Sequence, residues 1–217
     1  AAWRSATGQD VNSIDGDPLF TSSTDLSLLP GSPAIGAGIS IAGITTDITG
    51  SARTNPPAIG AYESRIAISV QIFLQGAYSV ALSRHKDVTT LWRDVLNIHA
   101  LNQPYNTPEF GNYNGGENVP AGFFTSTGAA TDIVDWVLVE LRDAGSPATI
   151  INRRAAFVRE DGVVVDLDGV SGVSFNGIAS GNYHIMIRHR NHLGIRTPVA
   201  QLIQGNTAAP TVYDFSF

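Results

Sequence analysis

The pattern of apolar and polar positions divides the chain into two parts near residue 64. Before that point apolar residues come only in very short clusters, separated by Gly, Ser, Asp and Pro. No cluster is long or periodic enough for a helix. Strands this short cannot bury a face alone, so they suit a solenoid in which each turn of chain packs on its neighbour. This part is therefore predicted to be a stack of short turns.

The remainder of the chain shows the alternation typical of β-strands. Apolar residues alternate with more polar neighbours from Arg65 to Leu74, which is the two-residue period of a half-buried strand. Ile133–Leu141 is apolar almost throughout, as expected for a central strand buried on both faces. Further strands are predicted at residues 149–158, 162–166, 172–175, 182–189, 195–203 and 211–217. The predicted fold class is all-β, with a β-sandwich over residues 65–217.

One segment of this second part departs from the strand pattern. Residues 87–101 carry apolar side chains at a spacing of three or four behind Asp87, a good helix-capping residue. They are predicted to form one short helix. Residues 102–130 are rich in Asn, Gly and Pro and contain no clear strand, so a long loop is expected there.

The first part carries a series of motifs whose order and spacing resemble a known family. The motifs are Asp17-Pro18-Leu19-Phe20, DLSLLPGSPAIGAG from Asp25 to Gly38, TDITG from Thr46 with Arg53, and IGAYE from Ile59 to Glu63. They resemble the closing rungs of right-handed parallel β-helix surface proteins of the choice-of-anchor type. Gly36 departs from the pattern, because the family usually has Asp there. The resemblance implies that residues 1–64 are the C-terminal turns of a parallel β-helix, whose other turns lie upstream in the same polypeptide.

The second part resembles, less sharply, a β-rich module found near the C-terminus of large secreted proteins of Gram-negative bacteria, including type IX-like ones. The segments that carry this resemblance are VDWVLVELRD from Val134, AAFV from Ala155, Asp161-Gly162, DLDG from Asp166 and IRHRNHLG from Ile187. Both resemblances imply a secreted or cell-surface location. The opening AAWRSATGQD shows no signal peptide, which an exported parent would explain by truncation.

Composition excludes several classes of function. Lys and Arg total 13 against 19 Asp and Glu, a formal charge of −6, and such a balance argues against nucleic-acid binding. No apolar run approaches the ~20 residues of a membrane-spanning helix. The absence of Cys removes disulfides, thiol catalysis and Cys-ligated zinc. No serine-hydrolase or nucleotide-binding motif is present. We therefore expect no catalytic residue, no nucleic-acid partner and no membrane insertion.

Two clusters carry side chains that can bind metal ions. Asp10, Asn12, Asp15 and Asp17 could chelate Ca²⁺ through hard oxygens, although they do not match the EF-hand spacing. The alternative is that they cap turns through side-chain hydrogen bonds. In the HRNH segment a shared zinc site would require the chain to turn after Arg190. We expect no cofactor, with Ca²⁺ as the one open alternative.

Aromatic residues in the predicted helix and the long loop lie among many Asn residues, as in surfaces that stack on sugar rings. A pair of arginines would in addition bind a uronate carboxylate through bidentate contacts. The candidate carbohydrate-binding residues are Trp92, Tyr105, Tyr113, Arg188 and Arg190. The alternatives are that the aromatics pin the loop onto the sheet and that the arginines pair with Asp135 or Glu140.

The function predicted from these features is that of a non-catalytic accessory module in a secreted cell-surface protein. The β-sandwich of residues 65–217 would cap the open end of the β-helix, because an uncapped solenoid exposes apolar stacks and unpaired strand edges. Carbohydrate binding would be a second role. The alternative is the C-terminal part of a β-helix polysaccharide lyase or glycoside hydrolase whose catalytic residues lie upstream.

Overall fold

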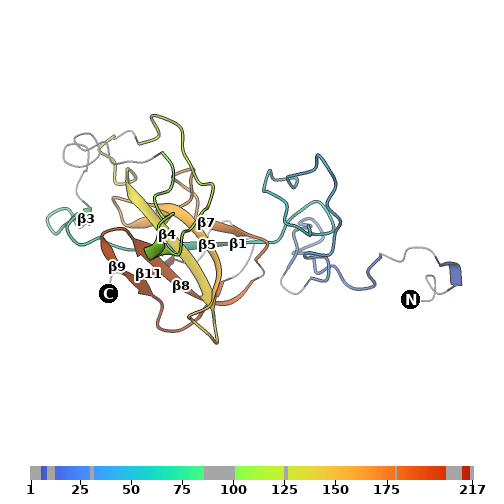
Figure 1. The fold of residues 1–217 in the computed structure, drawn as a ribbon. Helices are drawn as coiled ribbons and strands as arrows, with labels where there is room; N and C mark the ends of the chain where they lie inside the picture. The colour runs from blue at the N-terminus through green and yellow to red at the C-terminus, as the bar shows by residue number, and fades with distance from the viewer. Residues whose placement is uncertain are drawn as a thin grey trace. The chain divides into compact units, whose positions relative to one another are not determined.

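The structure is a computed structural model that describes residues 6–8, 13–29, 32–85, 101–124, 127–178, 180–203 and 212–215. Within these residues the protein is all-β with almost no helix (Figure 1). The helix predicted at residues 87–101 lies outside the described residues, apart from Leu101. The chain divides into two compact units. The first unit holds residues 1–66, 176–180 and 204–206, and the second holds the rest.

The second unit is built around one nine-stranded sheet. Its main path runs β10-β8-β4-β5-β6-β1-β11, while β7 pairs with β1 and β9 pairs with β8. The β1–β11 pair is parallel, whereas the β6–β1, β4–β5, β5–β6, β4–β8, β8–β9 and β8–β10 pairs are antiparallel. The strands are β1 (Arg65–Gln71), β4 (Ile133–Asp143), β5 (Ile150–Arg159), β6 (Val163–Val165), β7 (Val173–Asn176), β8 (Gly181–His189), β9 (His192–Arg196), β10 (Gln201–Ile203) and β11 (Val212–Asp214).

Strand β4 is central and buried, as its apolar sequence predicted. It lies between β5 and β8, and its successive side chains point to opposite faces of the sheet. Trp136 and Leu138 point to one face, where Trp136 packs on Phe157 of β5 with a centroid distance of 4.2 Å. Val137 and Val139 point to the other face and are fully buried. Burial on both faces explains why this strand reads as a continuous apolar run.

The long loop after residue 101 covers the Trp136 face of the sheet. Its described residues contain one short 3₁₀ turn, Pro108–Phe110, and no strand, as predicted. Side chains of the loop join the core cluster around Trp136, so the loop is packed structure. The loop residues buried in this cluster are Tyr105, Phe110, Tyr113 and Val119.

Two strand predictions needed correction. The single strand predicted at residues 195–203 is two strands, β9 and β10, because Thr197-Pro198 interrupts it. The Thr197 N–H still bonds the Ile185 carbonyl of β8 at 2.9 Å, but the following proline has no N–H to donate to the ladder. A two-residue pair, β2 (Tyr78–Ser79) with β3 (Arg84–His85), was not predicted. Segments this short carry no readable alternation.

The first unit is built differently. Its described residues 13–64 contain no strand, and their only bridges, Phe20↔Leu28 and Thr46↔Ala52, are isolated and antiparallel. Leu28, Ala34 and Ala58 form a small buried cluster with Ile35 packed against it. A parallel β-helix is not shown by these residues.

Candidate functional site

The candidate sugar-binding tyrosines hold the long loop against the sheet. Tyr105 is fully buried, donates a hydrogen bond from its hydroxyl to the Trp136 carbonyl at 2.7 Å, and packs edge-on against Phe110. Burial raises the pKa of Tyr105 well above its ordinary range. Tyr113 is buried beneath Arg153, and its hydroxyl donates to Glu117. Neither ring presents an open face, and the contacts of both match the alternative in which the aromatics pin the loop onto the sheet.

The candidate arginines are engaged separately within the protein. Arg188 stacks over the Phe110 ring at 4.6 Å, donates to the Glu109 carbonyl and lies 3.5 Å from the Glu140 carboxylate. Arg190 donates through one nitrogen to both carboxylate oxygens of Asp135 at 2.7 Å. The two guanidinium groups therefore do not form a joint anion site, and the predicted salt bridges to Glu140 and Asp135 are present. Trp92, the remaining candidate, lies outside the described residues.

Asp135 also holds the histidines of the β8–β9 turn. Its Oδ2 atom lies 3.1 Å from Nε2 of His189, whose Nδ1 atom lies 2.8 Å from Nδ1 of His192. Burial alone would raise the pKa of Asp135, but hydrogen bonds from His189 and Arg190 and the charge of Arg190 hold this pKa below its ordinary value. Burial and the neighbouring His189 lower the pKa of His192.

The candidate Ca²⁺ ligands are only partly described. Asp10 and Asn12 lie outside the described residues. The Asp17 Oδ1 atom accepts a hydrogen bond from the Leu19 N–H at 2.9 Å, which is the turn-capping alternative. Among the described residues, no three His, Cys, Asp or Glu side chains are grouped as a metal site. No helix described here has the length and hydropathy needed to cross a membrane.

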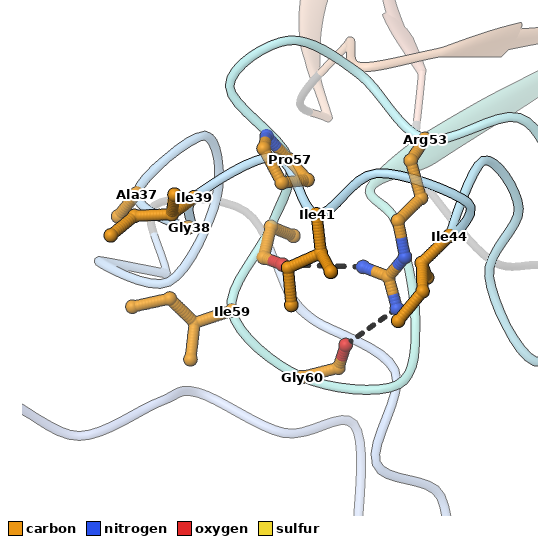
Figure 2. Close-up of a pocket in the computed structure, with 10 residues that line it drawn as sticks. Ala37, Gly38, Ile39, Ile41, Ile44, Arg53, Pro57, Ile59 and Gly60 are labelled. Carbon is orange, nitrogen blue, oxygen red and sulfur yellow. Dashed lines mark hydrogen bonds between the residues drawn. The ribbon is translucent and has the colours of Figure 1, made fainter.

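The first unit contains a groove of about 380 Å³ that the sequence did not predict (Figure 2). Isoleucine side chains line it, together with Pro57, Arg53 and neighbouring small residues. These isoleucines are largely solvent-exposed: Ile39 is 73%, Ile41 62%, Ile44 51% and Ile59 42% accessible. The sequence signal for their exposure is weak. The isoleucines lie between glycines and turn residues, without the regular alternation that would place them in a sheet.

Arg53 and Glu63 form the framework behind this groove. The Arg53 guanidinium donates to the Gly60 carbonyl at 2.9 Å, as Figure 2 shows, and to the Ala58 carbonyl at 3.3 Å. It also bonds the Glu63 carboxylate at 3.1 Å. Glu63 in turn accepts the Thr54 hydroxyl at 3.0 Å and the Ala58 N–H at 3.0 Å. All of these partners are internal, so Arg53 does not bring an unpaired charge to the groove.

Asp47 holds the backbone of the first unit through hydrogen bonds to its N–H groups. Its Oδ1 accepts the N–H groups of Thr49 and Ser51 at 2.8 and 2.9 Å, and its Oδ2 accepts the Glu63 N–H at 3.0 Å. Burial alone would raise the pKa of Asp47, but these hydrogen bonds outweigh burial and leave the pKa below its ordinary value.

Gly38 lies close to the backbone at Pro57. The Gly38 N–H donates to the Pro57 carbonyl at 2.7 Å, and a Cβ at Gly38 would lie 2.9 Å from that oxygen. Only glycine allows this approach.

The groove is therefore an apolar surface on a framework of buried, mutually satisfied polar groups. Such an arrangement has no acid–base or nucleophilic chemistry to offer, but it can bury aliphatic surface against a partner. Comparison with protein-family models, curated proteins and solved structures found no match for this chain.

Proposed function

We propose that this chain is a non-catalytic accessory module of a secreted bacterial surface protein, and that the isoleucine groove caps the end of an upstream β-solenoid in the same polypeptide. The observation that carries the proposal is the exposure of Ile39, Ile41, Ile44 and Ile59 along one groove of the first unit. The motif order from Asp17 to Glu63 resembles the closing turns of a parallel β-helix. Such turns follow the rest of the helix in the same polypeptide, which supports an upstream β-solenoid as the partner of the groove.

The chemistry of the groove suits the apolar end of a solenoid. Its isoleucine side chains are aliphatic and β-branched, and Arg53, the one charged residue among the described residues that line it, is bound to Glu63. The last rung of a β-helix presents stacked aliphatic side chains, which need an uncharged aliphatic cover. Burial of isoleucine contributes about 1.5–3 kcal/mol per side chain, so a few such contacts hold a cap in place.

Capping is favoured over glycan binding by the state of the second unit. Tyr105 and Tyr113 are buried, and Arg188 and Arg190 are bound to Glu140 and Asp135. A glycan would have to displace these contacts, whereas the isoleucine groove requires no rearrangement.

The test compares the double variant Ile39→Ser, Ile41→Ser in two settings. In the full natural polypeptide, we expect the free energy of unfolding of the solenoid–cap region to fall by about 3 kcal/mol or more, because two buried isoleucines are lost. In the 217-residue chain alone, the same change should stay within about 0.5 kcal/mol, since both side chains are exposed there. Denaturant unfolding measures both values.

Val170→Ser is the matched control, because Val170 is as exposed as Ile39 but belongs to the second unit. It should leave both settings unchanged. Equal effects of the double variant in the two settings, or none in the full polypeptide, would contradict the proposal.

A further inference from the structure

Strand β9 is an open edge of the nine-stranded sheet. Among the described residues it pairs with β8 alone. The Thr197 N–H bonds the Ile185 carbonyl of β8 at 2.9 Å. Because the direction of the backbone groups alternates along an antiparallel strand, the N–H and C=O groups of the preceding Arg196 point away from β8. No described strand lies beside them, so this edge can accept one more strand.

The side chains of β9 point alternately to two different surfaces. Ile195 lies opposite Ile187 of β8, and Arg196 lies opposite Met186. Ile195 and Arg196 therefore point to opposite faces of the sheet. Leu193 is on the Ile195 side, since both residues line the same cavity. A strand added beside β9 would meet apolar side chains on one face and a guanidinium group on the other.

The apolar face opens into a cavity of about 280 Å³. Leu193 is 97% exposed and Ile195 41% exposed, so both can contact a bound side chain. Across the cavity lie residues that follow β1 and β11. The apolar residues on that side are Ile72, Phe73, Leu74 and Phe215. The cavity therefore suits the apolar side chains of a strand that pairs with β9.

The opposite face carries positive charge at this edge. Arg196 is exposed and forms no ion pair with another described residue. Arg188 is on the same face, and its carboxylate contact, Glu140, is fully buried. The accessible charge beside β9 is therefore positive, although the formal charge of the chain is −6.

This charge selects the kind of strand that fits. A second copy of the chain would bring another Arg196 to the same edge, and like charges on neighbouring strands destabilise a pair. A carboxylate opposite Arg196 would stabilise it instead. The edge therefore favours a strand that is acidic on one face and apolar on the other.

We propose that β9 binds an extended peptide segment of a partner protein, in which acidic and apolar residues alternate, as an added antiparallel strand. The acidic residue opposite Arg196 exchanges backbone hydrogen bonds with it and pairs with its guanidinium group. The apolar residues on either side enter the cavity beside Leu193 and Ile195. This site lies in the second unit and is independent of the capping function proposed for the first.

The test is fluorescence anisotropy of a labelled, end-capped octapeptide of alternating Glu and Leu, titrated with the complete chain. We expect saturable binding that weakens as salt is added. Arg196→Gln and Leu193→Ala should each weaken binding at least about threefold, through the lost ion pair and the lost apolar contact. Arg65→Gln is the matched control, because Arg65 is also exposed but lies outside the cavity, and it should leave the affinity unchanged.

Methylation of the peptide backbone separates strand addition from simple apolar contact and leaves the protein unaltered. N-methylation of the Glu residues removes the N–H groups that face Arg196 and should weaken binding at least about tenfold. N-methylation of the Leu residues, whose N–H groups point away from β9, should change it by less than about threefold. Circular dichroism verifies that each variant is folded.

Four results would overturn the proposal. They are equal effects of the two methylations, full affinity in Arg196→Gln, tighter binding of a Lys–Leu peptide, and no binding of the Glu–Leu peptide. Sedimentation of the chain as a dimer that Arg196→Gln strengthens would assign the edge to a second copy instead, and would also overturn it.

Discussion

The two units of this protein both contain large apolar side chains but differ in how far these side chains are buried. In the second unit Trp136, Leu138 and Phe157 are fully buried between strands and loop. In the first unit Ile39, Ile41, Ile44 and Ile48 are mostly exposed, and of its described residues only Leu28, Ala34 and Ala58 form a core cluster. Apolar content therefore does not decide burial.

The difference comes from the period of the pattern. A strand with a regular two-residue alternation directs its apolar side chains to one face, where a sheet can bury them together. The first unit has no such run, so its chain is held by Asp47, Arg53 and Glu63 through hydrogen bonds. A polar framework can fix a backbone without covering its apolar side chains, and those side chains remain available to a partner.

The largest effect is expected at the centre of the sheet. Trp136→Ala removes a fully buried ring that packs on Phe157, so we expect a loss of about 3–5 kcal/mol in the free energy of unfolding. Urea unfolding followed by circular dichroism measures it. Leu193→Ala, at a position that is 97% exposed, should change stability by less than about 0.5 kcal/mol. A loss below about 1 kcal/mol for Trp136→Ala would refute the contrast between the units.

A smaller effect is expected for the framework of the first unit. Glu63→Gln leaves Arg53 without its carboxylate and cannot accept the same bonds from Thr54 and Ala58. Hydrogen bonds to charged groups contribute about 1.5–3 kcal/mol. We therefore expect the free energy of opening of this unit to fall by about that amount. Hydrogen exchange at the Ala58 amide is the measurement.

Asp17→Asn is the matched carboxylate-to-amide control, because Asp17 is exposed and caps a turn with one hydrogen bond to Leu19. In Asp17→Asn, hydrogen exchange at the Ala58 amide should be as slow as in the native chain. Faster exchange throughout the sheet in Glu63→Gln would show that the polar framework does not act on the first unit alone.

The smallest effect is a pH dependence confined to the second unit. His85 is fully buried, accepts the Leu74 N–H at Nε2 and contacts the Arg159 carbonyl through Nδ1. Burial lowers the pKa of His85 below its ordinary value of 6.5. As the pH falls the unfolded chain takes up this proton first, so the stabilisation is complete above pH 6.5 and is lost as the pH drops toward the folded pKa.

We therefore expect the second unit to lose stability between pH 7.5 and pH 5.5, and His85→Gln to have a shallower slope. Burial also lowers the pKa of His192, so part of the slope should persist in the variant. The first unit contains no histidine up to residue 66, and its stability should be constant over this range. Urea unfolding of the sheet and hydrogen exchange of residues 13–64 at both pH values measure this, and equal slopes in native and variant chains would contradict it.

The strands of the second unit were largely predictable because their residues carry the pattern themselves. Ile133–Leu141 is apolar almost throughout, and the strand that it forms lies at the centre of the sheet. The break at Thr197-Pro198 is visible in the sequence, but whether the strand continued beyond it depended on pairing with β8. Asp135 and Glu140 are five residues apart on this strand and point to opposite faces, since Asp135 contacts His189 while Glu140 pairs with Met186.

The candidate sites were less predictable because exposure and pairing depend on distant contacts. Tyr105 and Tyr113 could equally stack on sugars or on the sheet until the path of the loop was known, and both are buried. The approach of His189 to His192 required the turn at Arg190 and the position of Asp135 in β4. None of these relations has a local signal, because each joins residues from different segments.

By itself the sequence determined the all-β class, the position of the central strand and the change of character near residue 64, since each follows from local period and composition. Only the tertiary structure decided which apolar side chains remain uncovered and which polar groups are already paired. Burial and pairing depend on what packs against a residue from far along the chain, and local periodicity carries no information about that neighbour.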